Sequence, residues 1–296
     1  MKNIKEIVAV GSIAFDSIET SMGKREHILG GSSTFFGVAA SMFTKVYLIG
    51  VVGDDFSNKE WSLFEKYNID TSSIEIEKGQ TFSWGGKYNQ DFSSRETLYT
   101  NLGVFKNFKP KINSKYLNPI LYLGNIQPEL QFDVINKIEN PYIVAADSMN
   151  LWIDLFPKYV WKLIAKVDIF MLNDEEAFQL TGEKNLENII KLFLSLGPKI
   201  VIIKMGGEGC LVAYEDKIEH VSIVPNTSVY DPTGAGDSFA GGLLGYIAIN
   251  GLENPSAAAA AGSAVASYTV SGFGLEKLIT MTDDSLQNKI KQIKIS

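Results

Sequence analysis

The residues whose types and spacing suggest chemistry lie at 231–237, which read Asp-Pro-Thr-Gly-Ala-Gly-Asp. The Pro and Gly of this segment predict a turn, and apolar spacing over 235–249 predicts a helix directly after it. Backbone N–H groups at such a helix start have no partner within the helix and can surround an anion. The donors would be those of Gly234, Ala235 and Gly236. Asp237 has two interpretations, a carboxylate that complements the helix dipole and a base that takes a proton from an attacking hydroxyl.

A second glycine-containing segment is Gly30-Gly31-Ser32, which precedes another helix pattern. Its backbone lets a ligand approach closely, although an ordinary capped turn would have the same composition. Asp16 follows the first predicted strand, at the edge where open α/β sheets bind ligands. These residues are therefore candidates for contacts with a ligand.

Two further segments follow predicted strands. Asn173 and Glu176 have the spacing of a capping box, and the same oxygens could hold Mg²⁺ through water. The strand at 200–203 leads into Lys204-Met-Gly206-Gly-Glu-Gly209, a glycine-rich turn that is often only a connection. Neither segment establishes a site by itself.

Composition excludes several classes of function. The chain of 296 residues has 27 Lys+Arg and 34 Asp+Glu, a net charge of −7, which argues against a surface that binds nucleic acid through its phosphates. One cysteine and two histidines provide neither an intrachain disulfide nor a zinc shell, which fits a cytoplasmic protein. The sequence has no P-loop, no dinucleotide fingerprint, no G-x-S-x-G and no H-E-x-x-H. The apolar stretch at 7–10 is too short for a signal peptide, and we expect the alanine-rich stretch within 254–275 to be a packed helix without a membrane role.

The elements that must position these residues alternate between short β-branched runs and helix patterns. This alternation predicts a single α/β domain over 1–296, with a doubly wound, mostly parallel sheet flanked by helices. The predicted strands are 7–10, 46–49, 120–123, 142–146, 168–172 and 200–203. The predicted helices are 33–43, 58–67, 128–138, 175–180, 186–196 and 235–249. Segments 17–28 and 81–104 break the pattern, and we expect antiparallel strands there, outside the main sheet, with turns at Gly85-Gly86 and 89–94; they form either a decoration or a lid.

Together these motifs resemble the ribokinase-like, or phosphofructokinase-B, family of carbohydrate kinases over nearly the whole chain. The Gly30-Gly31 block and residues 49–56 are similar to the family's N-terminal signature, and 231–237 is similar to its C-terminal one. The resemblance implies ATP-dependent phosphorylation of a hydroxymethyl group on a small molecule, with a sugar as the default acceptor and a nucleoside as its rival. A non-catalytic regulator that binds nucleotide is a further alternative. The two irregular segments would form the lid, which in relatives often also makes a dimer interface.

The resemblance also assigns roles to individual residues. Asp237 would be the base, with the N–H groups of Gly234, Ala235 and Gly236 as the anion hole. Substrate contacts would come from Asp16, Gly30, Gly31 and Ser32, with Arg95 as a candidate for an anionic substrate. ATP would meet Asn173, Glu176, Lys204, Gly206 and Gly209, and Glu176 would position Mg²⁺ through water. Asp231 and Thr233 would hold a monovalent cation such as K⁺.

The sequence departs from the family at two places that concern the acceptor. Relatives specific for sugars commonly have Asn where this chain has Ala14 and Phe35, and loss of two amides removes hydrogen bonds that a sugar needs. Aromatic residues could instead stack on a nucleobase, or they could simply pack the lid. These residues are Phe35, Phe82, Trp84 and Phe92. Lys204 replaces a residue that is often Thr, and Asp147 follows a strand where it could face the site.

Overall fold

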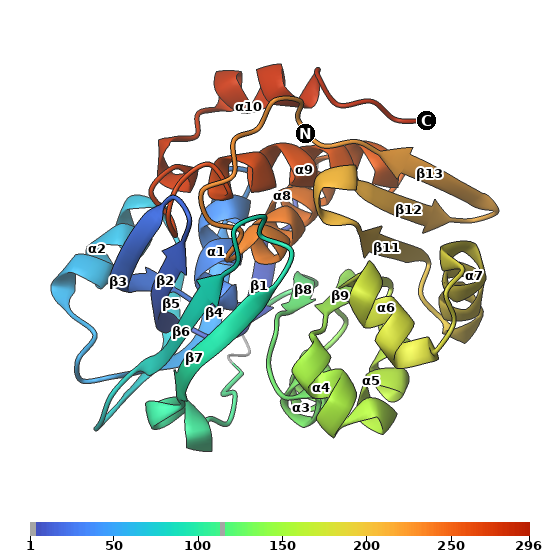
Figure 1. The fold of residues 1–296 in the computed structure, drawn as a ribbon. Helices are drawn as coiled ribbons and strands as arrows, with labels where there is room; N and C mark the ends of the chain where they lie inside the picture. The colour runs from blue at the N-terminus through green and yellow to red at the C-terminus, as the bar shows by residue number, and fades with distance from the viewer. Residues whose placement is uncertain (1–3, 113–115) are drawn as a thin grey trace.

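A nine-stranded sheet forms the centre of the computed structural model, which describes residues 4–112 and 116–296 (Figure 1). Its strand order is β13 (Lys217–Val221), β12 (Cys210–Tyr214), β11 (Ile200–Lys204), β10 (Ile169–Asn173), β9 (Ile143–Asp147), β8 (Ile120–Leu123), β1 (Ile7–Val10), β4 (Val46–Gly53) and β5 (Asp70–Glu77). The strands from β11 to β5 are parallel, and β12 and β13 pair in antiparallel register at one edge. The predicted doubly wound, mostly parallel sheet is confirmed.

Helices cover both faces of this sheet. On one face lie α1 (Ser32–Ser41), α8 (Ala235–Asn250), α9 (Pro255–Thr269) and α10 (Asp283–Ile290). The other face carries α3 (Pro128–Lys137), α5 (Pro157–Ile164), α6 (Asp174–Thr181) and α7 (Leu186–Leu196), with α4 (Asn150–Leu155) beside α6. Successive residues of β1 divide between the two cores, with Ile7 and Ala9 in one and Val8 and Val10 in the other. Burial on both faces explains why such strands are continuous apolar runs rather than alternating ones.

The alanine-rich segment forms α9, as expected, and packs closely against α8. Small residues allow this, because a β carbon on Gly242 would lie 3.0 Å from the Ala261 carbonyl oxygen and one on Gly262 would lie 2.7 Å from the Phe239 carbonyl oxygen. In the portion of the chain that the structure describes, no helix has the length and apolarity needed to cross a membrane.

A separate four-stranded sheet lies beside the main one, in the order β3 (Gly23–Gly30), β2 (Ala14–Thr20), β6 (Phe82–Tyr88) and β7 (Arg95–Asn101). The strands fall where the two irregular segments predicted them. The expectation of purely antiparallel pairing is wrong, because β2 and β6 run parallel. The turn predicted at Gly85-Gly86 is wrong as well: both residues lie inside β6, where the ring of Tyr99 covers Gly85 and that of Trp84 covers Gly86. The turn predicted at 89–94 does connect β6 to β7.

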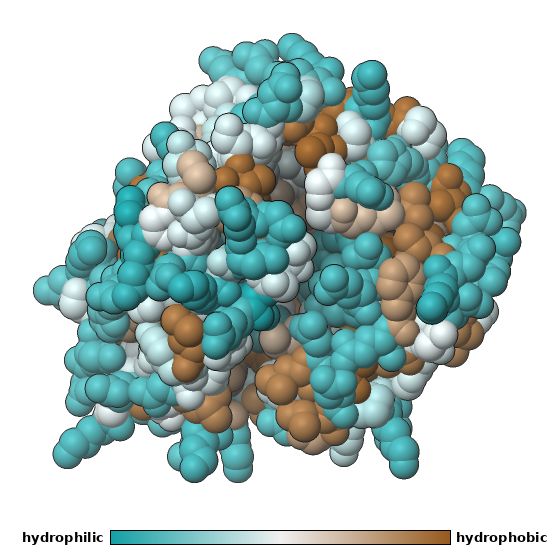
Figure 2. All heavy atoms as spheres, viewed as in Figure 1, coloured by the Kyte–Doolittle hydropathy of each residue, from teal (hydrophilic) through white to brown (hydrophobic). Residues whose placement is uncertain are grey.

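The remaining elements connect these layers. They are α2 (Asn58–Lys66) and the short 3-10 helices η1 (Gly103–Asn107), η2 (Gly206–Glu208) and η3 (Leu278–Thr280). Figure 2 shows the surface hollowed between the small sheet and the half of the molecule that carries α4 and α6.

Candidate active site

The start of α8 has the geometry of an anion site. Gly234 is left-handed, with φ +76°, and a β carbon there would lie 2.3 Å from the ring of Phe35, so that only glycine fits. Of the three expected donors, Ala235 already gives its N–H to Pro232 O at 3.2 Å to close the turn. The N–H groups of Gly234 and Gly236 have no partner among the described residues. Two unpaired donors therefore point away from the helix start.

Asp237 lies in the first turn of α8, half-buried beside these donors. Burial raises the pKa of its carboxyl to about 7, the nearby charge of Asp147 acts in the same direction, and the Lys204 ammonium opposes both. A carboxyl with a pKa near neutrality is well matched to accept a proton at physiological pH.

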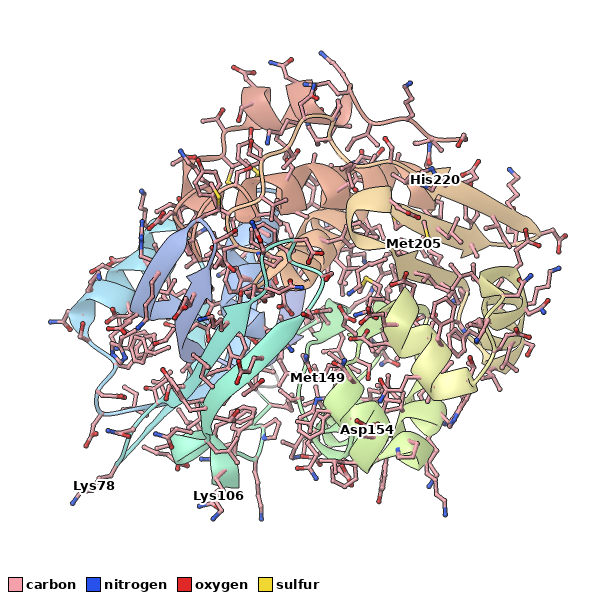
Figure 3. The ribbon with its side chains drawn as sticks, viewed as in Figure 1. Lys78, Lys106, Met149, Asp154, Met205 and His220 are labelled. Atoms are coloured by element: carbon pink, nitrogen blue, oxygen red, sulfur yellow. The ribbon has the colours of Figure 1, made fainter. Side chains whose placement is uncertain are left out.

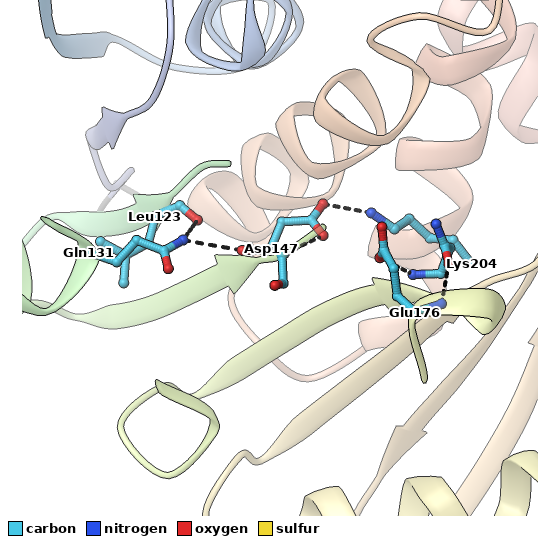
Figure 4. A network of polar contacts seen from close by, with 7 residues as sticks. Leu123, Gln131, Asp147, Glu176 and Lys204 are labelled. Atoms are coloured by element: carbon cyan, nitrogen blue, oxygen red, sulfur yellow. Dashed lines mark hydrogen bonds and ion pairs between the residues drawn. The ribbon is translucent and has the colours of Figure 1, made fainter. Parts of the chain in front are cut away.

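Three polar residues stand at the ends of neighbouring strands. Asp147 ends β9, Asn173 ends β10 and Lys204 ends β11. In Figure 3, the labels Met149 and Met205 mark the chain just after β9 and β11. Lys204 is paired with Asn173 in the sheet register, and its side chain reaches past β10 to Asp147, where Nζ donates to Oδ2 at 2.6 Å (Figure 4).

Asn173 and Glu176 form the predicted capping box of α6. The Asn173 side chain accepts from the Glu176 N–H at 2.7 Å, and Glu176 Oε2 accepts from the Asn173 N–H at 2.9 Å. Burial raises the pKa of Glu176 to about 7, although the Lys204 ammonium acts in the opposite direction. The prediction that this pair forms a capping box is therefore confirmed. The Glu176 carboxylate also lies near Lys204 at the end of β11.

A buried glutamine that the sequence did not suggest as a site residue fixes the end of β9 through hydrogen bonds. Gln131 of α3 is buried, and its Nε2 donates to Gly124 O at 2.9 Å and to Asp147 O at 3.2 Å. Asp147 Oδ1 accepts from the Ser148 N–H at 2.9 Å. A single glutamine within a helix pattern gives no signal for such a role, because only the fold places it behind the strand ends.

Asp16 approaches from the small sheet, where it is buried in β2 rather than just past β1. Burial raises the pKa of its carboxyl to about 7, against the lowering effect of a hydrogen bond from the Gly31 N–H. A β carbon on Gly30 would lie 2.0 Å from Asp16 Oδ2, so the glycine makes room for this carboxyl. Ser32 bonds instead to Ser12, through Oγ to the Ser12 N–H at 3.0 Å and through its own N–H to Ser12 Oγ at 3.1 Å.

Trp84 and Arg95 lie near Asp16. The register pairs Asp16 with Trp84, which places both side chains on one face of the small sheet. The Arg95 guanidinium lies 5.0 Å from the centre of the Trp84 ring, and its charge opposes, without overcoming, the rise in the pKa of both Asp16 and Glu176. Close by, Tyr88 contacts Thr233 through their hydroxyls at 3.0 Å, which ties the small sheet to the turn before α8.

Asp231 is fully buried and joins two loops. Oδ1 accepts from the Thr233 N–H at 2.8 Å and Oδ2 accepts from the Gly274 N–H at 3.0 Å. Burial raises the pKa of this carboxyl. The two residues expected to hold a cation thus fix the position of the turn that leads into α8.

The remaining candidates lie in the turn after β11 or in packed aromatic clusters. Gly206 begins η2 and Gly209 directly follows it, and the Met205 N–H donates to Gly209 O at 2.7 Å across this turn. Phe35 is buried beneath Gly234 and offers no ring face to a ligand. Phe82 stacks on Phe105, and both Phe92 and Trp84 pack against the cluster around Ile18 and Tyr88. Among the four aromatic candidates, Trp84 is the one beside Asp16.

The arrangement combines an acid from the small sheet, N–H donors and a half-buried carboxyl at α8, and a lysine with a second acid at the strand ends. A family model described as pfkB family carbohydrate kinase matches residues 5–280. The chain belongs to this family. The resemblance predicted from the motifs is therefore confirmed. The described residues contain no cluster of three or more His, Cys, Asp or Glu side chains that could hold a metal ion.

Curated relatives of this pfkB family member include kinases for different acceptors. A cytidine kinase of Thermococcus kodakarensis is 26% identical over 81% of this chain and 88% of the relative. A nucleoside kinase of Methanothermobacter thermautotrophicus is 23% identical over 97% and 96%, and a ribokinase of Staphylococcus aureus is 24% identical over 75% and 74%. Kinase activity is supported by these names and by the family, but they differ in acceptor.

Solved structures show the same fold. The nucleoside kinase of Methanocaldococcus jannaschii superposes with a TM-score of 0.80 at 19% identity, covering 98% of this chain and 99% of that one. A fructokinase from Vibrio cholerae, in a form with bound fructose, ADP and potassium ion, superposes with a TM-score of 0.82 at 18% identity, covering 98% and 99%. These similarities establish the ribokinase-like fold and leave the acceptor open.

Proposed function

We propose that the chain transfers the γ-phosphoryl group of ATP to the hydroxymethyl group of a nucleoside. The observation that carries the transfer chemistry is Asp237, placed beside two unpaired N–H donors at the start of α8. Asp237 takes the proton of the attacking hydroxyl, and the N–H groups of Gly234 and Gly236 stabilise the charge on the phosphoryl oxygens.

The donor nucleotide lies along the ends of β10 and β11. Asn173, Glu176, Lys204, Gly206 and Gly209 line this edge. The residues fit Mg²⁺ held mainly by phosphates and water, because Glu176 supplies one carboxylate at this edge and uses only Oε2 for the helix cap. Mg²⁺ bound there would neutralise phosphate charge, while Glu176 orients its water shell. A monovalent cation near Asp231 and Thr233 would stiffen the turn that the two residues already position.

The acceptor lies against the inner face of the small sheet, which acts as a lid. The Asp16 carboxyl, held in place by the hydrogen bond from the Gly31 N–H, meets the hydroxyls of a pentose. Ala14, on the same face of β2 as Asp16, and buried Phe35 offer no hydrogen bond, whereas the Trp84 ring with the Arg95 guanidinium forms a flat surface for a base. This contrast, together with the nucleoside-specific names of long-matching relatives, favours a nucleoside over a free sugar.

The test is release of ADP with Mg²⁺ and K⁺ across a panel of nucleosides, pentoses, hexoses and sugar phosphates. We expect turnover on nucleosides, and turnover confined to free sugars would contradict the acceptor assignment while leaving the kinase assignment intact. Trp84→Ala should raise the acceptor KM about tenfold or more, because one stacked base contributes about 1–3 kcal/mol. Tyr99→Ala is the matched control, because Tyr99 covers Gly85 on the other face of the same sheet and bonds to Ser17 at 2.8 Å. Equal effects of the two changes would refute stacking on Trp84.

A further inference from the structure

Lys204 brings a side-chain cation to an anion site otherwise made of backbone. A β carbon on Gly236 would lie 3.2 Å from Lys204 Nζ, so the ammonium stands directly against the first turn of α8. The lysine side chain is 18% exposed and that of its partner Asp147 is 7% exposed. The contact therefore lies inside the site and is shielded from bulk water.

An ion pair with only a structural role would not be stabilised at this position. The start of a helix carries partial positive charge, which repels a cation and attracts an anion. Desolvation makes a buried pair a weak source of stability in general. The place instead suits a phosphoryl group, which would meet the ammonium and the N–H groups of Gly234 and Gly236 together.

Asp147 explains how the ammonium stays there when no anion is present. Its Oδ2 accepts from Lys204 at 2.6 Å, while Oδ1 accepts from the Ser148 N–H at 2.9 Å. Gln131 holds the backbone of the same residue. The carboxylate is thus fixed on the far side of β10 and draws Lys204 across the strand end (Figure 4). Burial lowers the pKa of Lys204, but Asp147 and Glu176 more than compensate and raise it, which keeps the amine charged.

We propose that Lys204 is a catalytic residue that contacts the transferred phosphoryl group, and that Asp147 is the positioning residue that holds it there. The proposal rests on the proposed kinase function. In the transfer, the bond from the γ-phosphorus to the bridging oxygen of ADP breaks and the bond to the acceptor oxygen forms. The acceptor proton goes to Asp237. Lys204 keeps its protons and offsets the negative charge that the phosphoryl oxygens carry in the transition state.

The experiment compares Lys204→Met, Lys204→Arg, Asp147→Asn and the double variant Lys204→Met/Asp147→Asn, after turnover of the wild type has been established. Lys204→Met should lower kcat by about 100-fold or more, as for loss of an anion-hole donor, while the KM for ATP and the Kd for ADP measured by calorimetry change less than about threefold. Lys204→Arg should recover part of kcat, because it keeps the charge. Asp147→Asn should lower kcat by a smaller factor, on the order of tenfold, because Lys204 is present but no longer held.

The double variant separates catalysis from stability. It removes both charges, so it should recover the thermal stability that Lys204→Met loses by leaving Asp147 unpaired, yet keep the low kcat of Lys204→Met. Recovery of kcat in the double variant would overturn the proposal, because the pair would then be structural only. An equal loss of ADP affinity and kcat in Lys204→Met would also overturn it.

Lys199→Met is the matched control. Lys199 immediately precedes β11, and its Nζ bonds to Asp168 Oδ1 at 2.8 Å at the opposite end of the same strand. Its loss should leave kcat within about twofold of the wild type, because an exposed pair contributes little. Failure of the wild type to phosphorylate any acceptor would instead refute the proposed function, before any variant is compared.

Discussion

Asp237→Asn should make the protein more stable while it removes activity. The pKa of Asp237 is raised from 3.8 to about 7, chiefly by burial. The folded protein therefore holds a proton that the unfolded chain has lost, so this group favours folding at low pH and its contribution is lost as pH rises from about 4 to about 7. A shift of about three pKa units corresponds to roughly 4 kcal/mol at about pH 8, and water at the half-buried carboxyl reduces this to about 2 kcal/mol.

Asparagine keeps the shape of the side chain without the charge, so the variant should escape this penalty. For a chain of this size we expect the melting temperature to rise by about 3 °C at about pH 8, and by clearly less at about pH 5. Thermal melts at both pH values measure the effect, and turnover of the same samples should fall by a factor of about 10² to 10⁴. Asp216→Asn, in the exposed turn between β12 and β13, is the control and should show no such pH-dependent gain. A variant that is less stable than the wild type at about pH 8 would refute the argument.

Three further predictions concern the same site. The value of kcat/KM should rise with pH through about 7, reaching only about a tenth of its plateau one pH unit below, because the base must be ionised, and a flat profile across this range would contradict the role of Asp237. Gly30→Ala should raise the acceptor KM about tenfold or more in steady-state assays without changing the KM for ATP, because the new methyl group would occupy the place of Asp16 Oδ2. Glu176→Gln keeps an oxygen for the Asn173 N–H and should leave the melting temperature nearly unchanged at about pH 5, where the buried carboxyl is protonated, yet raise the Mg²⁺ concentration needed for half-maximal activity several-fold. Equal responses of Glu176→Gln and Glu176→Ala in melting temperature would show that the capping contact is unimportant.

The predictable parts of the fold are those in which both faces of a strand are buried. The apolar runs of β1, β8 and β11 correspond closely to the predicted strands, because burial between two helical layers leaves no place for polar residues. By contrast, β5, β12 and β13 were not predicted. The edge strands β5 and β13 contain many exposed or half-buried residues, so their sequences lack that signal. The strand β12 is an apolar run with mostly buried residues, and it was missed although it carries the signal.

Residues that act through the chain's own local geometry were also predictable. The capping box of Asn173 and Glu176 and the turn before Asp237 each depend on spacing of a few residues, and both form as expected. The pair of Lys204 and Asp147 could not be predicted in this way. Its members are 57 residues apart and belong to strands separated by β10, so their contact depends on the strand order of the sheet. Gly85 and Gly86 show the opposite case, a local pattern that gave a wrong prediction. The pair was expected to form a turn, but both glycines lie within the small sheet, where their lack of a side chain leaves room for the rings of Tyr99 and Trp84.

The electrostatics of the site explain how an acidic protein can bind a polyphosphate. Burial raises the pKa of Asp16, Glu176 and Asp237 to about 7 in each case, so the site near neutral pH carries less negative charge than its sequence implies. Each raised pKa reduces stability once the carboxyl ionises, so a site selected for stability alone would not contain three such groups. A pKa raised to near neutrality is useful only where a carboxyl must lie close to an anion and still exchange a proton or hold a hydroxyl. The positive charge of Lys204 lies among these acids and offsets part of their negative charge, so the site does not need a basic surface.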